Sequence, residues 1–102
     1  MSIMHPAIIL LKKIPRGKVV TYKEMARVCR TSPRAIGRIM ARNTSPAQFP
    51  CYKVVASSGA LTGYSAPGGM RKKRALLLGD GIPLTHGRVD KKYFHSFGNR
   101  VY

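Results

Sequence analysis

The sequence predicts a single α/β domain that is mostly helical, and three observations lead to this prediction. The chain has 102 residues, of which 44% are apolar, enough for one modest hydrophobic core and too few for a two-domain enzyme. Two helix-start signals follow each other closely, at Thr21 and at Ser32. A short valine run after Pro50 has the composition of a buried strand. We therefore expect residues 1–102 to form one domain.

The first predicted helix covers residues 6–14. Pro6 suits the first helical turn, where its missing N–H would be unpaired in any case. The apolar residues 7–11 follow, and Pro15 ends the helix. Residues 16–17 have the composition of a turn, and residues 18–20 form a short extended segment that leads to Thr21.

Residues 21–42 carry the pattern of a helix-turn-helix. Thr21 and Glu24 have the spacing of a capping box, in which each side chain satisfies a backbone donor at the start of a helix over residues 22–28. Residues 29–31 interrupt this helix. Ser32 as N-cap and Pro33 at the first helical position then begin a second helix that runs to about residue 42. Two short helices joined in this way predict a small winged-helix-like domain.

The second of these helices has an apolar and a basic face. At helical spacing, Arg34, Arg38 and Arg42 form one cationic stripe. Gly37 beside the stripe lets another backbone approach closely. The stripe suits a phosphate backbone, although a solvated basic face gives the same pattern. The residues predicted to face inward are Ala35, Ile36, Ile39 and Met40.

The rest of the chain contains one short strand, one helix and an irregular tail. Residues 43–49 are predicted as a loop, residues 54–56 as a buried strand and residues 60–67 as a loop that carries Tyr64 and could bind a ligand. Residues 70–78 have helix-forming composition. The tail, residues 83–102, has no period, and we expect it to be partly ordered through Tyr93, Phe94 and Phe97.

The charge of the chain points to an acidic partner. Subtracting 3 Asp and Glu from 19 Lys and Arg leaves a net charge of +16. Nucleic acid, anionic lipid and acidic protein all fit such a charge. The longest apolar run is far shorter than the roughly 20 residues of a membrane span, and no secretory leader pattern begins the chain. We expect an intracellular protein without a membrane partner and with two free thiols.

Few residues have the spacing that chemistry requires. The cysteines and histidines are scattered without zinc-ligand spacing, which predicts no metal, and we expect no cofactor. The three acidic residues do not suit a pair of catalytic carboxylates. Gly68 and Gly69 precede a basic helix, yet they lack the spacing of known phosphate loops. Cys29 has the context of a packing residue. Cys51 lies at a loop-to-strand junction, where a nucleophile can be held exposed and rigid.

The segment around Cys51 resembles a known active site. Pro50-Cys51-Tyr52-Lys53-Val54-Val55, followed by Gly63-Tyr64-Ser65, is similar to the active-site segment of the O6-alkylguanine-DNA alkyltransferases, the methylated-DNA-protein cysteine methyltransferases. The usual form there is Pro-Cys-His-Arg-Val. The resemblance extends upstream to residues 17–22, 32–37 and 42–43 and downstream to residues 68–69 and 76–81. Together it covers roughly residues 5–85.

The resemblance implies a DNA-repair protein that acts once. In this family a helix-turn-helix enters the minor groove of duplex DNA, an arginine replaces the extruded base, and the O6-alkylguanine gives its alkyl group irreversibly to the cysteine. Arg34 matches the arginine and Cys51 the acceptor, while Tyr22 matches a tyrosine that rotates a phosphate and donates toward guanine N3. Small residues that sit close to the DNA are matched by Ala35 and Gly37. The substrate site is matched by Asn43, Met40, Val54, Tyr64 and Ser65.

Two positions depart from the family pattern. Tyr52 replaces the histidine that takes the thiol proton through water, and Asp80 replaces the glutamate that orients this histidine. A phenol is a poor base at neutral pH, so Tyr52 either donates a hydrogen bond to the thiolate or relays a proton through water. We expect reactivity to be kept and retuned.

Two other functions remain open at this stage. The family's alkyltransferase-like proteins bind the lesion without repairing it, usually with the cysteine replaced, and recruit other repair factors. A basic protein that coats DNA explains the charge but leaves residues 50–65 unexplained. We expect a repair protein that is monomeric and that lies in the cytoplasm or at the nucleoid.

Overall fold

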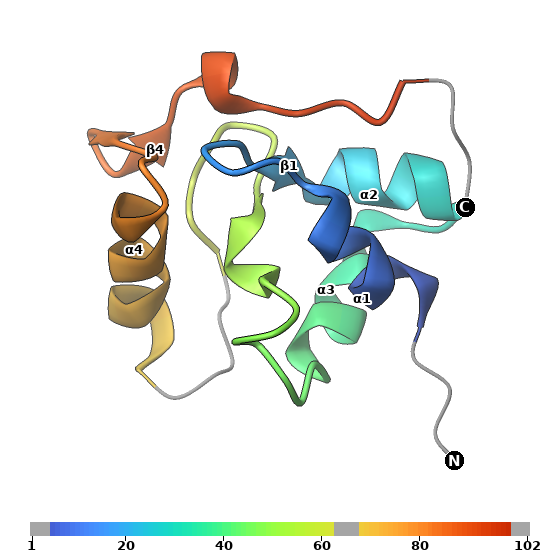
Figure 1. Ribbon diagram of the computed structural model, residues 1–102. Coiled ribbons are helices and arrows are strands. Elements are labelled where there is room, and N and C mark those ends of the chain that lie inside the picture. Colours follow the sequence, from blue (N-terminus) through green and yellow to red (C-terminus); the bar gives the residue numbers. More distant parts are fainter. Residues whose placement is uncertain (1–4, 63–67, 99–102) are drawn as a thin grey trace.

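The computed structural model describes residues 5–62 and 68–98, and it confirms a mostly helical α/β domain (Figure 1). Within these ranges, three one-turn 3-10 helices and four two-residue strands lie between or after the α-helices. In chain order the elements are α1 (Pro6–Leu10), η1 (Leu11–Lys13), β1 (Val20–Thr21), α2 (Tyr22–Cys29), α3 (Pro33–Ala41), η2 (Cys51–Lys53), β2 (Val54–Val55), α4 (Gly69–Gly79), β3 (Leu84–Thr85), β4 (Arg88–Val89) and η3 (Lys91–Tyr93). Tyr64 and Ser65 lie outside the described residues.

A pair of parallel strands separates two hydrophobic clusters. Val20 of β1 pairs with Val54 of β2, and both side chains belong to the first cluster, with α1, α2 and α3. Because side chains alternate across a strand, Val19 and Val55 belong to the second cluster, with Leu77 of α4. Figure 1 shows α4 on one side of these strands and the other three helices on the opposite side.

The helix-turn-helix forms for local reasons, as predicted. Thr21 Oγ1 accepts a hydrogen bond from the backbone N–H of Glu24 at 2.9 Å. Ser32 Oγ accepts one from the N–H of Ala35 at 3.1 Å. Between the helices, Arg30 takes the left-handed conformation with φ 56°, which reverses the chain. The second half of the predicted capping box is wrong, because the carboxylate of Glu24 binds other groups.

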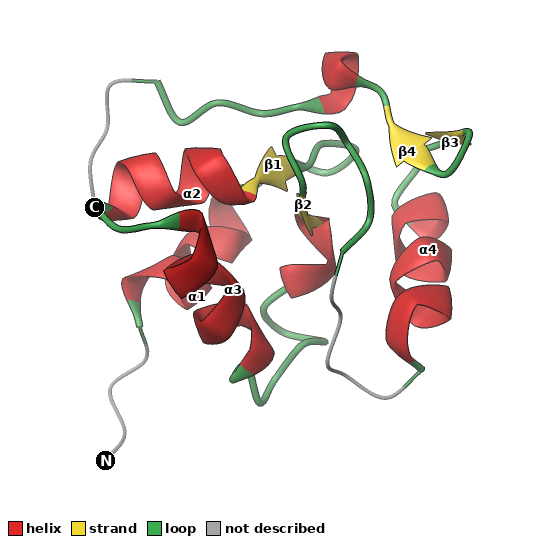
Figure 2. Ribbon diagram, turned by 180° about the vertical axis from the view of Figure 1, so that it is seen from behind, coloured by secondary structure: helices red, strands yellow, loops and turns green. Residues whose placement is uncertain are grey.

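The tail is more regular than its sequence suggests. β3 and β4 form an antiparallel hairpin, which was not predicted (Figure 2). After the hairpin the chain runs beside β1, where the carbonyl of Tyr93 accepts from the N–H of Val19 at 2.8 Å and the N–H of His95 donates to the carbonyl of Val19 at 2.7 Å. As expected, its aromatic residues dock. Tyr93 and Phe94 pack on the second cluster, and Phe97 is buried in the first.

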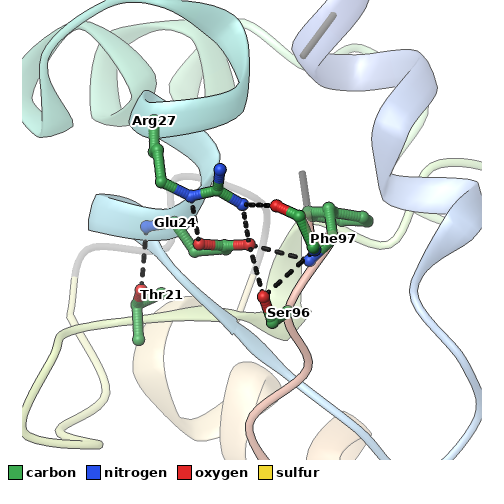
Figure 3. Close-up of polar contacts among 6 residues, drawn as sticks. Thr21, Glu24, Arg27, Ser96 and Phe97 are labelled. Atoms are coloured by element: carbon green, nitrogen blue, oxygen red, sulfur yellow. Dashed lines mark hydrogen bonds and ion pairs between the residues drawn. The ribbon is translucent and has the colours of Figure 1, made fainter. Parts of the chain in front are cut away.

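Glu24 of α2 anchors the end of the described tail (Figure 3). Its Oε2 accepts from the N–H of Phe97 at 2.8 Å and from Oγ of Ser96 at 3.2 Å. Arg27 donates to both carboxylate oxygens of Glu24 and also to the carbonyl of Gly98. The hydrogen bond from Arg27, with a smaller contribution from the N–H of Phe97, lowers the pKa of Glu24 to about 2. The tail therefore clamps the helix-turn-helix through one charged group.

This anchor predicts acid sensitivity. Because the pKa of Glu24 is depressed on folding, its contribution is complete above the unfolded value of 4.5 and is lost as the pH falls toward 2. Glu24→Gln is expected to lower the free energy of unfolding at pH 7 by about 2 kcal/mol, since hydrogen bonds to a charged group are lost. It is also expected to flatten the pH dependence between 4.5 and 2. Urea unfolding at several pH values checks both effects.

Ser96→Ala is the matched control, because it removes one of the longer contacts and keeps the carboxylate. Ser96→Ala is expected to lower the free energy of unfolding by less than Glu24→Gln does. The pH dependence of its stability is expected to equal that of the unaltered protein. Equal stability of Glu24→Gln and the unaltered protein across this pH range would contradict the anchor.

Candidate nucleophile and adjoining groove

Cys51 is fixed at the first position of η2. Its N–H donates to the carbonyl of Phe49 at 2.8 Å, and the N–H of Lys53 donates to the carbonyl of Pro50 at 3.1 Å. These bonds turn the chain just before β2. The expectation of an exposed thiol is wrong, because Cys51 is only 7% exposed and belongs to the first cluster. The site is rigid and covered.

The two residues that depart from the family pattern face other groups. The half-buried ring of Tyr52 packs against the second cluster, whereas Cys51 belongs to the first. Oδ2 of Asp80 lies 2.9 Å from Nζ of Lys53 and accepts from the N–H of Gly17 at 3.1 Å. Asp80 thus holds a buried lysine and the turn before β1. The catalytic role that the resemblance implies for Asp80, at the position of the family's orienting glutamate, stays a prediction that these contacts do not support.

An open groove lies between the helix-turn-helix and the segment that follows β2. Its volume is about 780 Å³. Three of the predicted site residues line it, namely Tyr22, Arg34 and Gly37, and a Cβ added at Gly37 would meet open space. Apart from Lys23, small residues from both sides form the remaining described wall, which the sequence did not reveal. The described lining comprises Tyr22, Lys23, Pro33, Arg34, Gly37, Ala41, Ala56, Ser57 and Thr62.

The basic stripe of α3 borders this groove. Arg34, Arg38 and Arg42 are all exposed, and Ala35 is half-buried beside them. Lys23 of α2 adds a further exposed cation to the lining. A polyanion that lies along α3 would therefore meet positive charge along the whole helix.

The structure gives internal partners to three residues that were predicted to bind substrate. Nδ2 of Asn43 donates to the carbonyl of Phe49 at 2.8 Å, and its Oδ1 accepts from the N–H of Ser45 at 3.1 Å. Asn43 thus ties the end of α3 to the residue before Pro50. Met40 is buried in the first cluster rather than among the described lining residues. The carbonyl of Val54 accepts from Nζ of Lys73 at 2.7 Å.

Lys73 is the residue that sequence reasoning missed. It is 1% exposed, and its Nζ also donates to the carbonyl of Thr62 at 2.8 Å. Burial lowers its pKa to about 8, and negative charge on Cys51 opposes that shift. The position one turn before the buried Leu77 places Lys73 on the inner face of α4. This helical spacing could have predicted that Lys73 is buried. Lys73 is, however, one of four consecutive basic residues, 71–74, and such a run is typical of an exposed face.

Tyr22 connects the groove to Lys73. Its ring centroid lies 5.9 Å from Nζ of Lys73, and its hydroxyl donates to the carbonyl of Thr62 at 3.5 Å. Burial raises the pKa of Tyr22, which keeps the phenol protonated and able to donate near neutral pH. Burial likewise raises the pKa of Cys29, so the second thiol carries less thiolate.

Neither a metal site nor a membrane span is found in the described part of the chain. Residues 5–62 and 68–98 contain no group of three His, Cys, Asp or Glu side chains that could hold an ion. No helix within these ranges is long and apolar enough to cross a bilayer.

Comparison with known proteins identifies one family. Residues 5–82 match the model of the DNA-binding domain of 6-O-methylguanine DNA methyltransferase. The methylated-DNA–protein-cysteine methyltransferase of Pyrobaculum aerophilum is 47% identical over 74 residues, which are 72% of this chain and 49% of that protein. The matched part of the chain spans 30% of the length of one curated relative, the bifunctional methyltransferase/endonuclease of Picrophilus torridus, and 49% of the Pyrobaculum protein.

Solved structures agree with this match. The O6-methylguanine-DNA methyltransferase of Pyrococcus kodakaraensis has a TM-score of 0.68 and 40% identity, over 74% of this chain and 44% of that one. The S. pombe ATL protein in complex with DNA has a TM-score of 0.71 and 26% identity, over 88% of this chain and 91% of that one.

Proposed function

Because the chain belongs to the 6-O-methylguanine DNA methyltransferase family, we propose that it repairs duplex DNA by moving the alkyl group of O6-alkylguanine to Cys51. The observation that carries this proposal is the placement of Cys51. The cysteine is held rigidly by η2 at the start of a family motif, and Lys73 connects its surroundings to the groove beside α3. Each molecule acts once, since a thioether is chemically stable to hydrolysis in water.

The basic stripe and the groove have different roles in binding DNA. Arg38 and Arg42 hold the phosphate backbone along α3. Arg34 lies where the stripe meets the groove, so its side chain enters the stack in place of the extruded base. Gly37 lets the backbone of α3 come close to the DNA. Extrusion is needed because the alkyl carbon cannot be reached inside the stack.

The reaction is an in-line displacement. Sγ of Cys51, as thiolate, forms a bond to the alkyl carbon while the bond from this carbon to O6 breaks. The electron pair stays on the guanine, which takes up one proton. Tyr22, protonated and at the wall of the groove, turns its hydroxyl from the carbonyl of Thr62 and donates a hydrogen bond toward guanine N3, which favours the departing base. No cofactor takes part, and the protein acts as a monomer in the cytoplasm or at the nucleoid.

Tyr52 replaces the family histidine without replacing its basicity. Its ring belongs with the second cluster, and a phenol with a pKa near 10 takes few protons at pH 7. We therefore assign Tyr52 at most a hydrogen bond or a water relay toward the thiolate. Another group must supply most of the activation of Cys51.

A lesion sensor is the second candidate, and one observation favours it. The likeness to the S. pombe ATL protein covers 88% of this chain, against 74% for the Pyrococcus methyltransferase. An alkyltransferase-like protein would bind O6-alkylguanine and recruit other repair factors. The cysteine in the family motif favours repair.

The fate of the lesion separates the two functions. A duplex with one O6-methylguanine is mixed with excess protein and then digested to nucleosides. Repair predicts that the methylated nucleoside disappears in proportion to the protein added, up to one lesion per molecule. A lesion that stays intact in DNA bound by the protein would show a sensor. Unmodified duplex at the same concentration serves as the binding control.

A further inference from the structure

The hairpin of β3 and β4 carries a small hollow that is lined by cations. We call it the hairpin hollow. Its volume is about 330 Å³, and its described lining comprises Ser58, Thr85, Arg88, Val89, Asp90 and Lys91. Arg88 and Lys91 are both exposed. Within residues 5–62 and 68–98, neither of these two side chains has an ion pair or a hydrogen bond. Two such cations beside two hydroxyl groups suit an oxyanion.

Asp90 lines the same hollow but has a structural task. Its Oδ1 accepts from the N–H of Lys92 at 2.9 Å and so caps η3. The carboxylate offsets one of the two cations, so the described lining keeps an excess of one positive charge. The hairpin hollow therefore favours a single phosphate over a neutral ligand.

A short turn connects the hairpin hollow to the groove beside α3. The N–H of Val89 in β4 donates to the carbonyl of Gly59 at 2.9 Å. Ala56 and Ser57, which precede this glycine, line the groove, whereas Ser58 lines the hollow. In Figure 2 the turn lies between α3 and the hairpin. The two sites thus lie on opposite sides of one turn.

The junction between turn and hairpin is close and therefore fixed. Gly59 has a φ of 84°, and a Cβ at this position would clash with the carbonyl oxygen of Val89. Only glycine lets β4 pack against the turn in this way. The domain extends 38 Å along its longest axis. At 3.4 Å per base step, a phosphate at the hollow lies within about eleven steps of one at the groove.

We propose that the hairpin hollow binds a backbone phosphate of the duplex that flanks the lesion. Arg88 and Lys91 supply the charge, and the hydroxyl of Ser58 donates a hydrogen bond, since its Oγ already accepts from the N–H of Ala60. The inference rests on the proposed function for the identity of the ligand. It adds a second contact with DNA, beyond residues 5–82, which match the family model.

An acidic segment of a partner protein would also meet two cations here. The duplex is favoured because the hollow continues a surface that is already basic. The stripe of α3 borders the groove, the groove ends at Ser57, and the hollow begins at the next residue. A duplex seated in the groove therefore has its flank near the hairpin without any further partner.

The experiment measures affinity for a duplex with a central O6-methylguanine as a function of salt concentration. All proteins carry Cys51→Ala, so the lesion stays in the DNA. The variant with both Arg88→Gln and Lys91→Gln is expected to lower the slope of log affinity against log salt by about one, the effect of losing one phosphate contact. A slope equal to that of the parent would overturn the proposal.

Arg16 provides the matched control for Arg88. It is an exposed arginine in the turn before β1, and it is not among the described lining residues of the groove or of the hollow. Arg16→Gln removes the same charge as Arg88→Gln. It is expected to leave the slope unchanged, whereas Arg88→Gln alone is expected to lower both the slope and the affinity at low salt. Equal effects of the two variants would show a general loss of charge and contradict the site.

The position of the flank gives a second readout. The lesion fixes where the protein sits, and the hairpin lies on one side of the groove. Duplexes are therefore made with a flank longer than about eleven base pairs on only the 5′ or only the 3′ side of the lesion. Arg88→Gln is expected to weaken binding to one of these duplexes and to leave the other unchanged. Equal weakening of both would overturn the proposal.

Asp90→Asn is expected to change affinity in the opposite direction. Asparagine caps a helix as well as aspartate does, so η3 keeps its start while the hollow loses its negative charge. Binding to the duplex whose flank reaches the hairpin is expected to become tighter. If an acidic protein were the ligand, Asp90→Asn and Arg88→Gln would both bind duplex as the parent does.

These outcomes are separate from those of the repair assay. No transfer takes place in the Cys51→Ala proteins, so a missing flank effect counts against the hairpin hollow alone. A lesion that stays intact with the unaltered protein, while the flank effect is present, counts against repair alone.

Discussion

Cys51→Ala is expected to abolish alkyl transfer while DNA binding persists. The alkyl carbon needs a thiolate, and the other thiol is a poor substitute, because burial raises the pKa of Cys29. Removal of Sγ leaves the basic stripe and the groove in place, since Cys51 is not among the described residues that line the groove. The assay follows the loss of O6-methylguanine from duplex and, in parallel, the affinity for the same duplex.

Cys29→Ala is the matched control for this prediction. It removes the second thiol from the same cluster, and transfer is expected to continue at nearly the parental rate. If transfer survives in Cys51→Ala and stops in Cys29→Ala, the acceptor is Cys29, and the proposed role of Cys51 is wrong.

Arg34→Ala is expected to slow alkyl transfer from duplex DNA by about 10- to 100-fold. Extrusion of a base costs a few kcal/mol, and the side chain of Arg34, which takes the place of the base in the stack, offsets part of this cost. Free O6-alkylguanine base needs no extrusion. Its transfer to Cys51 is therefore expected to change little, and the ratio of the two rates is the quantity to measure.

Arg38→Ala separates the filling of the stack from simple electrostatics. Arg38 is exposed one turn further along α3 and lies outside the described lining of the groove. Its loss is expected to weaken duplex binding, mostly at low salt, and to leave transfer from bound duplex nearly unchanged. Equal losses for Arg34→Ala on duplex and on free base would refute its role in the stack.

Local signals made the helix-turn-helix predictable from the sequence. The caps of Thr21 and Ser32 lie within three residues of the N–H groups that they satisfy. Helical spacing likewise places Ile36 and Met40 in the core and leaves Arg34 and Arg38 exposed. Such contacts depend on neighbours in the chain, so pattern reasoning reaches them.

The features that were missed depend on contacts between distant segments. The carboxylate of Glu24 has the spacing of a capping box, yet the tail arrives 73 residues later and offers the N–H of Phe97. Lys73 stands in a run of basic residues that is typical of a solvated face, but α4 turns it toward Val54, 19 residues earlier. Cys51 is covered because the first cluster closes over it. Only the assembled fold shows which group each of these side chains meets.

The central claim is that the protein itself becomes the alkyl acceptor, and its intact mass tests this most directly. The chain is mixed with duplex that contains O6-methylguanine, and its mass is measured before and after, followed by fragmentation of the peptide around residue 51. The account predicts a gain of one methyl group per molecule, located on Cys51 and absent after mixing with unmodified duplex. An unchanged mass under conditions in which the protein binds the methylated duplex would contradict the account and leave a lesion sensor in its place.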